Sequence, residues 1–427
     1  MKKLTLISLA LWCGVVLNTN AQNYIRIDTS FYSQALDEVK MINVYLPVDY
    51  YQNPEQEYAV IYYLHAANGN QNSSHTYAKW YYDIHVEDTT ITSPPAIFVG
   101  PNGDCQPYAG SLFVNSELYG NYEDYVMQDV IGFIENNYRV IQDKNFRLIT
   151  GTSMGGFGSA NLSTTYPDQF RAAFPYIGFP SMPDTTLETW KNLYYLEQGS
   201  YFPDCFSGGF NTSLLCTMCG GLSPNVNNPP NYVDFPFDIL GNWIDDVLDR
   251  WYEHDASRKV KDLPDENELA WFLACGTVDY MCTYPAYLQF MDSLDFYGIS
   301  YDYYFFEDGH IFYLPAWEAG VHWMDSIINL SFMTIGITDI EKSQGYLAVY
   351  PNPVFNQLNL TYHVTQPGMV NIRILDQQGR QVAEVLNAYQ ERGTHQKAWR
   401  MGSQAAGLYL IRMQTANTVM TKKIIKY

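Results

Sequence analysis

The pentapeptide Gly151-Thr152-Ser153-Met154-Gly155 restricts the fold of this 427-residue chain more than any other feature of its sequence. It fits the pattern G-x-S-x-G, in which a sharp, strained turn joins a strand to a helix and projects the serine hydroxyl above the sheet. Such a turn needs small residues two positions before and after the serine. The pattern also occurs by chance in surface loops, so the flanking residues decide whether it marks a strand-to-helix turn. Residues 146–150 favour a strand and residues 154–166 favour a helix that Pro167 ends, which indicates a nucleophile at Ser153.

The remainder of residues 22–335 alternates between strand and helix patterns. Tyr24–Thr29 and Val39–Leu46 predict an opening pair of strands. Apolar runs rich in β-forming residues predict further strands at Tyr58–His65, Pro95–Pro101, Phe146–Thr150, Glu268–Cys275 and Ser300–Phe306. Helices are expected at Asn121–Tyr138, Met154–Tyr166, Tyr284–Tyr297 and Leu314–Ile328. This alternation predicts an α/β domain with a mostly parallel central sheet.

Residues 180–262 interrupt the alternation. They are rich in Pro, Gly, Asn and aromatic residues, and a structureless loop of this length is rare in a compact domain. We therefore expect a lid insertion with some helix, notably at Ile239–Tyr252. Its Trp190, Trp243 and Trp251 form either an aromatic platform for a ligand or the core of the insertion itself.

The last part of the chain has a different character. Residues 346–427 contain short alternating strands (MVNIRIL, GLYLIRM, TKKIIKY) between glycine-containing turns, which predicts a small all-β sandwich domain after a linker at 336–345. From Gln344 onward there are nine Lys and Arg against three Asp and Glu, so this part carries +6 and the remainder −27 of the net charge of −21. Because so acidic a chain repels phosphate backbones, we expect no nucleic-acid partner.

Residues 1–21 have the composition of an export signal. Lys2 and Lys3 precede the apolar run Leu4–Leu17, and small residues around Ala21 suit cleavage by signal peptidase. The run is too short for a membrane span, and no later stretch predicts a transmembrane helix. We expect a secreted or cell-surface protein.

Six cysteines follow the expected signal, and an exported chain can pair them in disulfides. We expect structural pairing within Cys205–Cys219 and a second disulfide between Cys275 and Cys282. Cys216 and Cys219 form a C-x-x-C motif, but no histidine lies at ligand spacing. No metal site and no cofactor are expected.

A serine hydroxyl becomes a good nucleophile only beside a base that a carboxylate orients. His310 is the expected base, because it follows the strand at 300–306 and so lies at the same carboxyl edge of the sheet as Ser153. The other histidines after Ser153 are in less suitable places. His254 precedes the last core strands, His322 lies within a helix, and His363 and His395 belong to the β module.

Asp279 is the expected carboxylate, because it follows the strand at 268–275 at that same edge. Asp308 competes with it, but it lies only two residues from His310, a spacing at which a side-on contact with the imidazole is awkward.

The oxyanion of a tetrahedral intermediate needs two N–H donors already in place. The first is expected at Met154, directly after the serine. The second is expected in the loop after Tyr58–His65, at Ala67, with Ala66 as the next choice. His65 itself is expected to be structural.

Five blocks in order resemble the esterase D/feruloyl esterase-like branch of the α/β-hydrolases. They are YYLHAANGN, LYGNYEDYVMQDVIGFIENNYRV, GTSMGGFGSANLSTTYPDQF, CGTVDY and EDGHIFYLPAWEAGVHWM. The resemblance implies an α/β-hydrolase fold and ester hydrolysis over about the first 335 residues. It places the family's triad on Ser153, Asp279 and His310, and the second oxyanion donor on Ala67. Ala66 departs from the family's usual glycine, and the insertion has no counterpart, so the family's substrate does not carry over.

The tail, which opens with Tyr-Pro-Asn-Pro at 350–353, resembles the C-terminal sorting domain of type IX secretion in Bacteroidetes. The resemblance implies transport by the type IX machinery across the outer membrane, followed by release or surface attachment. The alternative is a sugar-binding β-sandwich appended to an enzyme.

Three functions follow as hypotheses. The first is a secreted serine carboxylic ester hydrolase that acts through an acyl-enzyme on acetyl or feruloyl esters of carbohydrates. The second is acyl transfer to a sugar hydroxyl, as in the mycolyltransferases of the same branch. The third is a catalytically inactive surface binding protein, which the complete Ser-Asp-His set disfavours.

Overall fold

The computed structural model describes residues 23–88, 91, 93–198, 204–205, 208–263, 269–281, 283–336, 345–350, 352–402, 404–416 and 418–427. The expected signal peptide at 1–21 lies outside these residues, and so do residues 337–344 of the expected linker.

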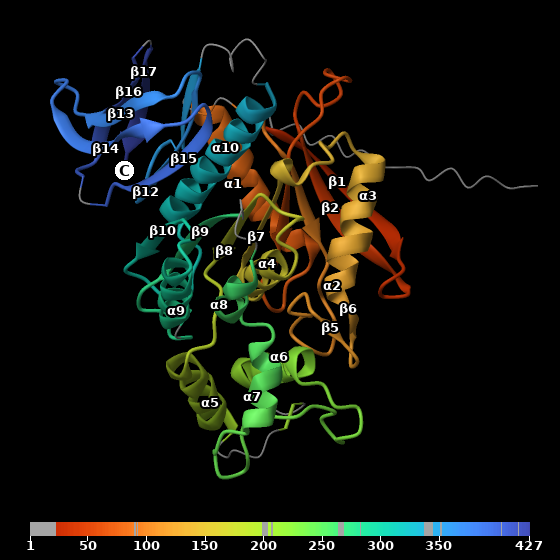
Figure 1. Cartoon of the computed structure of the whole chain (residues 1–427). Coiled ribbons are helices and arrows are strands. Elements are labelled where there is room, and N and C mark those ends of the chain that lie inside the picture. Colours follow the sequence, from red (N-terminus) through yellow and green to blue (C-terminus); the bar gives the residue numbers. More distant parts are fainter. Residues whose placement is uncertain are drawn as a thin grey trace, which may run out of the picture.

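An eight-stranded sheet forms the centre of the main part of the chain (Figure 1). In spatial order its strands are β1 (Tyr24–Ser33), β2 (Glu38–Pro47), β4 (Ile97–Pro101), β3 (Val60–Leu64), β7 (Arg147–Thr152), β8 (Ala172–Tyr176), β9 (Ala270–Gly276) and β10 (Tyr301–Phe306). The β1–β2 and β2–β4 pairs are antiparallel, and every pair from β4 to β10 is parallel. The expected α/β-hydrolase fold with a mostly parallel sheet is confirmed.

Helices cover both faces of the sheet, because the central strands are buried on both sides. In β3, Val60, Tyr62 and Leu64 point into one apolar cluster, whereas Ile61 and Tyr63 point into the other. The first cluster packs against α3 (Ile131–Asn137), α4 (Met154–Thr165) and α9 (Thr283–Phe296), and the second against α1 (Ser74–Glu87) and α10 (Leu314–Gly336). The helix expected at 121–138 consists of α2 (Tyr122–Asp124), a π-helical stretch (Tyr125–Val130) and α3.

Strand β8 has no counterpart among the sequence predictions. It lies between β7 and β9 in the interior of the sheet and contains Pro175. A proline cannot donate to the hydrogen-bond ladder, so its presence argues against a central strand when only the sequence is considered.

The insertion contains α5 (Asp184–Gln198), α6 (Phe210–Leu222), α7 (Asp245–Tyr252) and α8 (Ala256–Lys259), and α5, α6 and α7 lie together beyond one end of the sheet (Figure 1). The helix predicted at Ile239–Tyr252 is shorter in the structure, where α7 spans Asp245–Tyr252. Asp238 accepts the N–H groups of Leu240 and Asn242 and holds a turn there, so that α7 begins only at Asp245.

The tryptophans of the insertion belong to its own core rather than to an open platform. Trp190 and Trp251 are buried, and Trp243 is half-buried. Each indole N–H has a partner within the protein. The N–H of Trp190 donates to the carbonyl oxygen of Met281. That of Trp251 donates to the Ser223 hydroxyl, and that of Trp243 donates to the Glu188 carboxylate.

One disulfide, Cys205–Cys216, joins α6 to the segment before it. It satisfies the expectation of pairing within Cys205–Cys219, and Cys219 keeps a free, buried thiol. The expected Cys275–Cys282 disulfide is wrong, because Cys275, on β9, has a free thiol packed in the core. Cys282 itself lies outside the described residues.

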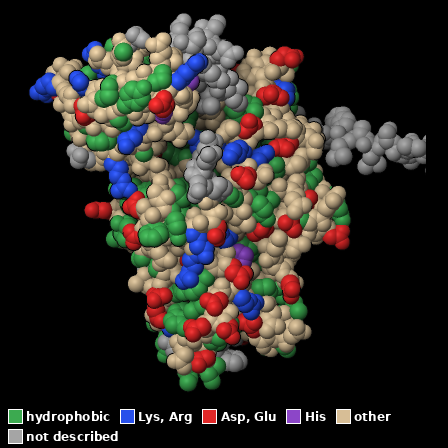
Figure 2. All heavy atoms as spheres, in the orientation of Figure 1, with side chains coloured by type: hydrophobic (Ala, Val, Ile, Leu, Met, Phe, Trp, Pro, Cys, Tyr) green, Lys and Arg blue, Asp and Glu red, His purple; other side chains and the backbone are tan. Residues whose placement is uncertain are grey.

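The C-terminal module is all β, as expected. One sheet contains β11 (Tyr346–Tyr350), β12 (Gln357–Val364) and β15 (Gly393–Arg400), and the other contains β14 (Gln381–Gln390), β13 (Gly368–Leu375), β16 (Gly407–Gln414) and β17 (Val419–Lys426). Their inner faces share one apolar core. Figure 2 shows Lys and Arg side chains over this module, at the upper left, and many Asp and Glu side chains over the insertion. Among the described helices, none combines the length and apolar character that crossing a membrane requires.

Candidate active site

Ser153 occupies a strained turn between β7 and α4. Its φ of 55° and ψ of −114° lie in a region that residues with a side chain rarely adopt. Two glycines make the turn possible. A Cβ at Gly155 would overlap the carbonyl oxygen of Leu64, and one at Gly151 would overlap that of Gly155. The turn therefore presents Ser153 at the carboxyl edge of the sheet, as the G-x-S-x-G pattern predicts.

His310 and Asp279 meet Ser153 at that edge. Nε2 of His310 lies 2.9 Å from Oγ of Ser153, and Nδ1 lies 2.6 Å from Oδ2 of Asp279. With Asp279 ionised, Nδ1 donates to the carboxylate, and Nε2 is left to accept the serine proton. The three side chains thus form a continuous hydrogen-bonded chain from three distant parts of the sequence.

Strand ends bring these side chains together. Asp279 follows β9 and His310 follows β10, and these two strands are parallel neighbours. The loops also bond directly to each other, because the N–H of Val278 donates to the carbonyl oxygen of Asp308 over 3.2 Å. The competing carboxylate of Asp308 is exposed and accepts the N–H of Gly309 instead.

The Asp279 side chain is fully buried. Besides His310, it accepts the N–H of Met281 over 2.8 Å and the hydroxyl of Thr283 over 2.6 Å. Burial alone raises the pKa of this carboxyl, but the hydrogen bond and charge of His310, together with Thr283 and Met281, outweigh burial and lower the pKa below its ordinary value. The carboxylate is therefore ionised at neutral pH. Thr283, the first residue of α9, was not among the sequence predictions.

The remaining histidines have other surroundings. His254 is half-buried, and the loss of hydration lowers its pKa to about 4. His322 faces Asp88 from within α10, and His363 and His395 lie in the C-terminal module. Within the part of the chain that the structure describes, His310 is the histidine that bonds to Ser153.

The two expected oxyanion donors lie at the start of α4 and in the loop after β3. Met154 is the first residue of α4, where an N–H has no acceptor within the helix. Ala67 lies half-buried in the loop after β3. Across the described ranges, neither N–H meets a hydrogen-bond acceptor. The carbonyl oxygen of Ala66, the alternative position, binds Nδ1 of His65 and the N–H of Gly69.

His65 supports that loop. Its Nε2 accepts the N–H of Gly103 over 2.8 Å, and its Nδ1 donates to the carbonyl oxygen of Ala66 over 2.8 Å. Burial lowers its pKa to about 4, so the ring is neutral at physiological pH. A neutral ring with both nitrogens engaged has a structural role.

The fold and the position of Ser153 are those of the α/β-hydrolase class. A solved structure of a ferulic acid esterase shares the fold with a TM-score of 0.51, at 19% sequence identity, over 72% of this chain and 98% of that one. The model of the family described as "Putative esterase" matches residues 33–280, which is more than half of the chain. The chain therefore belongs to this esterase family.

Two curated relatives match a shorter region. Esterase MT1326 and Esterase Rv1288, from two strains of Mycobacterium tuberculosis, are each 27% identical to this chain over 143 residues. The match covers 33% of this chain and 29% of each relative, so it spans less than a third of their length.

The C-terminal module also has a family. Residues 348–427 match the model of a secretion system C-terminal sorting domain. The expected type IX sorting domain is thereby confirmed, and its presence supports export of the chain.

Proposed function

We propose that this chain is an exported serine carboxylic ester hydrolase with Ser153 as nucleophile, His310 as general base and acid, and Asp279 as the residue that orients His310. The hydrogen-bonded chain Ser153–His310–Asp279 carries this proposal. Membership of the esterase family supports it.

In the first half of the reaction, Oγ of Ser153 attacks the ester carbonyl carbon while Nε2 of His310 takes the hydroxyl proton. The carbonyl oxygen becomes an oxyanion, which accepts hydrogen bonds from the N–H groups of Met154 and Ala67. His310 then gives the proton to the departing alkoxide, which leaves as an alcohol, and the acyl group stays on Ser153 as an ester.

In the second half, a water molecule replaces the alcohol. His310 removes one proton from the water as its oxygen attacks the acyl-enzyme, and returns that proton to Oγ as the bond to Ser153 breaks. The products are a carboxylic acid and the free serine. The buried carboxylate of Asp279 stabilises the imidazolium that forms in each half.

We propose acetyl or feruloyl esters of carbohydrates as the substrates. The support is the ferulic acid esterase whose fold this chain shares, together with a sorting domain that supports export, outside the cell where such carbohydrates occur.

The test combines one variant with a panel of substrates. The wild-type protein and Ser153→Ala are assayed on p-nitrophenyl acetate, acetyl-xylan and methyl ferulate. We expect turnover by the wild type and a loss of about 10⁶-fold in kcat for the variant, with an unchanged circular dichroism spectrum. Equal turnover by both proteins would refute Ser153 as the nucleophile, and turnover of p-nitrophenyl acetate alone would refute the carbohydrate esters.

A further inference from the structure

The loop that carries Ala67 is held by a second segment of the chain. The N–H of Asn68 donates to the carbonyl oxygen of Ala109 over 2.6 Å. Asn68 has a φ of 57°, in the left-handed region, which an isolated loop would not favour. Because Asn68 directly follows Ala67, this bond fixes the peptide next to the proposed oxyanion donor.

The same segment also contacts the other donor residue. A Cβ at Gly110 would lie 2.5 Å from Sδ of Met154, so the Met154 side chain packs directly on this glycine. Gly110 has a φ of 146°, which favours glycine. Residues 109 and 110 therefore contact the residue after one proposed donor, Ala67, and the side chain of the other, Met154.

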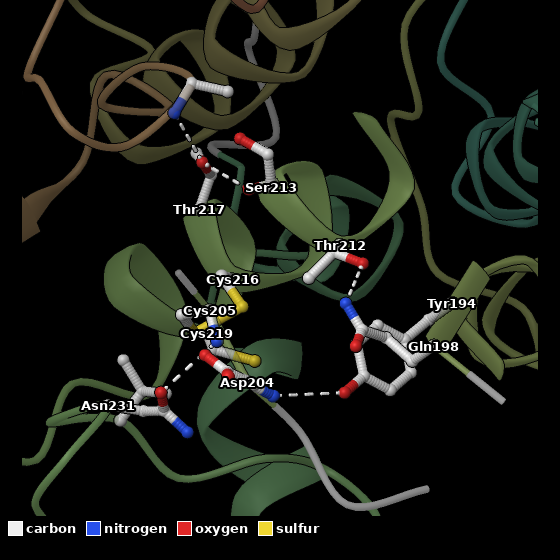
Figure 3. Close-up of a disulfide and its surroundings, with 12 residues drawn as sticks. Tyr194, Gln198, Asp204, Cys205, Thr212, Ser213, Cys216, Thr217, Cys219 and Asn231 are labelled. Atoms are coloured by element: carbon white, nitrogen blue, oxygen red, sulfur yellow. Dashed lines mark hydrogen bonds between the residues drawn. A yellow bond between two sulfur atoms is a disulfide. The ribbon is translucent and has the colours of Figure 1, made fainter. Parts of the chain in front are cut away.

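Helix α6 of the insertion holds this segment in turn. The N–H of Ala109 donates to Oγ1 of Thr217 over 2.7 Å. The Thr217 hydroxyl donates its own proton to the carbonyl oxygen of Ser213 over 2.8 Å (Figure 3). Thr217 has no solvent exposure and Ala109 has 2%. Since water does not reach this position, the Thr217 hydroxyl is the acceptor on which the buried N–H depends.

A covalent bond anchors α6 beside Thr217. The adjacent residue, Cys216, forms the disulfide with Cys205, as Figure 3 shows. The N–H of Cys205 donates to the side-chain oxygen of Asn231 over 3.2 Å, so the disulfide joins α6 to the rest of the insertion.

We propose that Thr217 is a positioning residue for the reaction: through Ala109 it sets the loop that carries the second oxyanion donor, and the Cys205–Cys216 disulfide keeps α6 in place. This inference rests on the proposed function. Oxyanion stabilisation requires donors at fixed positions, and a displacement of about 1 Å costs on the order of 100-fold in rate. The insertion then acts as a support for the catalytic loop.

Three variants separate positioning from general stability. Thr217→Val keeps the shape but removes the acceptor, and Thr217→Ser restores the acceptor. Thr212→Val is the matched control, because Thr212 lies on the same helix with 1% exposure, and its hydroxyl bonds to Glu197 and Gln198 on α5 instead. All three are compared with wild type by the rate at which a fluorophosphonate labels Ser153, and by kcat and KM on p-nitrophenyl acetate.

We expect Thr217→Val to lower kcat and the labelling rate by about tenfold or more with KM within about twofold, because the loss falls on the transition state. Thr217→Ser and Thr212→Val stay within about twofold of wild type. Should Thr217→Val fail to fold, Cys205→Ser tests the same support of α6 by removing the disulfide instead of the Thr217 acceptor. The expected loss in kcat is about threefold.

Equal kcat values for Thr217→Val and Thr212→Val, or for Cys205→Ser and wild type, would overturn the inference and leave the proposed function intact. An unlabelled, inactive wild-type protein would instead overturn the proposed function and this inference with it.

Discussion

Asp279 and His310 are joined by a hydrogen bond of 2.6 Å between Oδ2 and Nδ1, and the carboxylate has no contact with solvent. A charge in this position is not screened by water, so it both orients the imidazole and stabilises its protonated form. The carboxylate is itself stabilised by Met281 and Thr283. Each of these contacts fits the catalytic role proposed for Asp279, which a substitution can measure.

Asp279→Asn keeps the size of the side chain but removes its charge. We expect kcat on p-nitrophenyl acetate to fall by about 10³- to 10⁴-fold, because an amide does not favour the tautomer in which Nδ1 carries the proton. KM stays within about twofold. The matched control is Asp308→Asn, two residues from His310 in the same loop, which should retain full activity. Comparable losses in the two variants would contradict the assignment of Asp279.

Gly155→Ala tests the turn that presents Ser153. The added Cβ would overlap the carbonyl oxygen of Leu64, which belongs to a central strand and has no room to move. We expect the free energy of unfolding to fall by about 2–3 kcal/mol or more, as measured by urea denaturation. Gly132→Ala in α3, where a Cβ meets nothing within 4 Å, should instead stabilise the protein by about 0.5–1 kcal/mol. A stable, fully active Gly155→Ala protein would show that the turn does not need glycine.

The sequence predicts the triad because each of its members follows a strand of a parallel sheet. Apolar runs end just before Ser153, Asp279 and His310, and parallel strands bring their carboxyl ends to one edge. Spacing along the chain was therefore enough to bring together residues far apart in sequence. The glycines on either side of Ser153 were equally informative, since only a strained turn needs both.

Other features depend on contacts that no local pattern records. Thr217 looks like an ordinary helical threonine until the structure brings Ala109 to its hydroxyl, across 108 residues of sequence. Strand β8 is hidden by Pro175, whose missing N–H would normally exclude a central strand. The apolar residues Ile239 and Leu240 fit a helical pattern, but the Asp238 carboxylate captures the backbone there.

Asp302 links the stability of the protein to pH. Its carboxyl, on β10, accepts the N–H groups of Asn356 and Gln357 from the C-terminal module. Burial raises its pKa to about 7, and these N–H groups oppose the rise only in part. An unfolded aspartate releases its proton near pH 4, so between about pH 4 and pH 7 the folded state holds more protons than the unfolded state. Within this window, a rise in pH favours unfolding through Asp302.

Asp302→Asn removes this titration. We expect its free energy of unfolding, measured by urea denaturation, to fall less than that of wild type between pH 5 and pH 8. The difference is at most about 3 kcal/mol, because about two pH units of the window lie in this range and each corresponds to about 1.4 kcal/mol. The slope with pH is the readout, because any lost hydrogen bond lowers stability equally at both values. Parallel pH profiles for the two proteins would contradict a titrating Asp302.

The covalent intermediate tests the central claim most directly. The wild-type protein is mixed with p-nitrophenyl acetate, quenched in acid within the first turnover, digested and analysed by mass spectrometry. We predict one acetyl group on the peptide that contains Ser153, and none on that peptide from Ser153→Ala. An acetyl group on a different residue, or turnover by the wild type with no acylated peptide, would contradict the account.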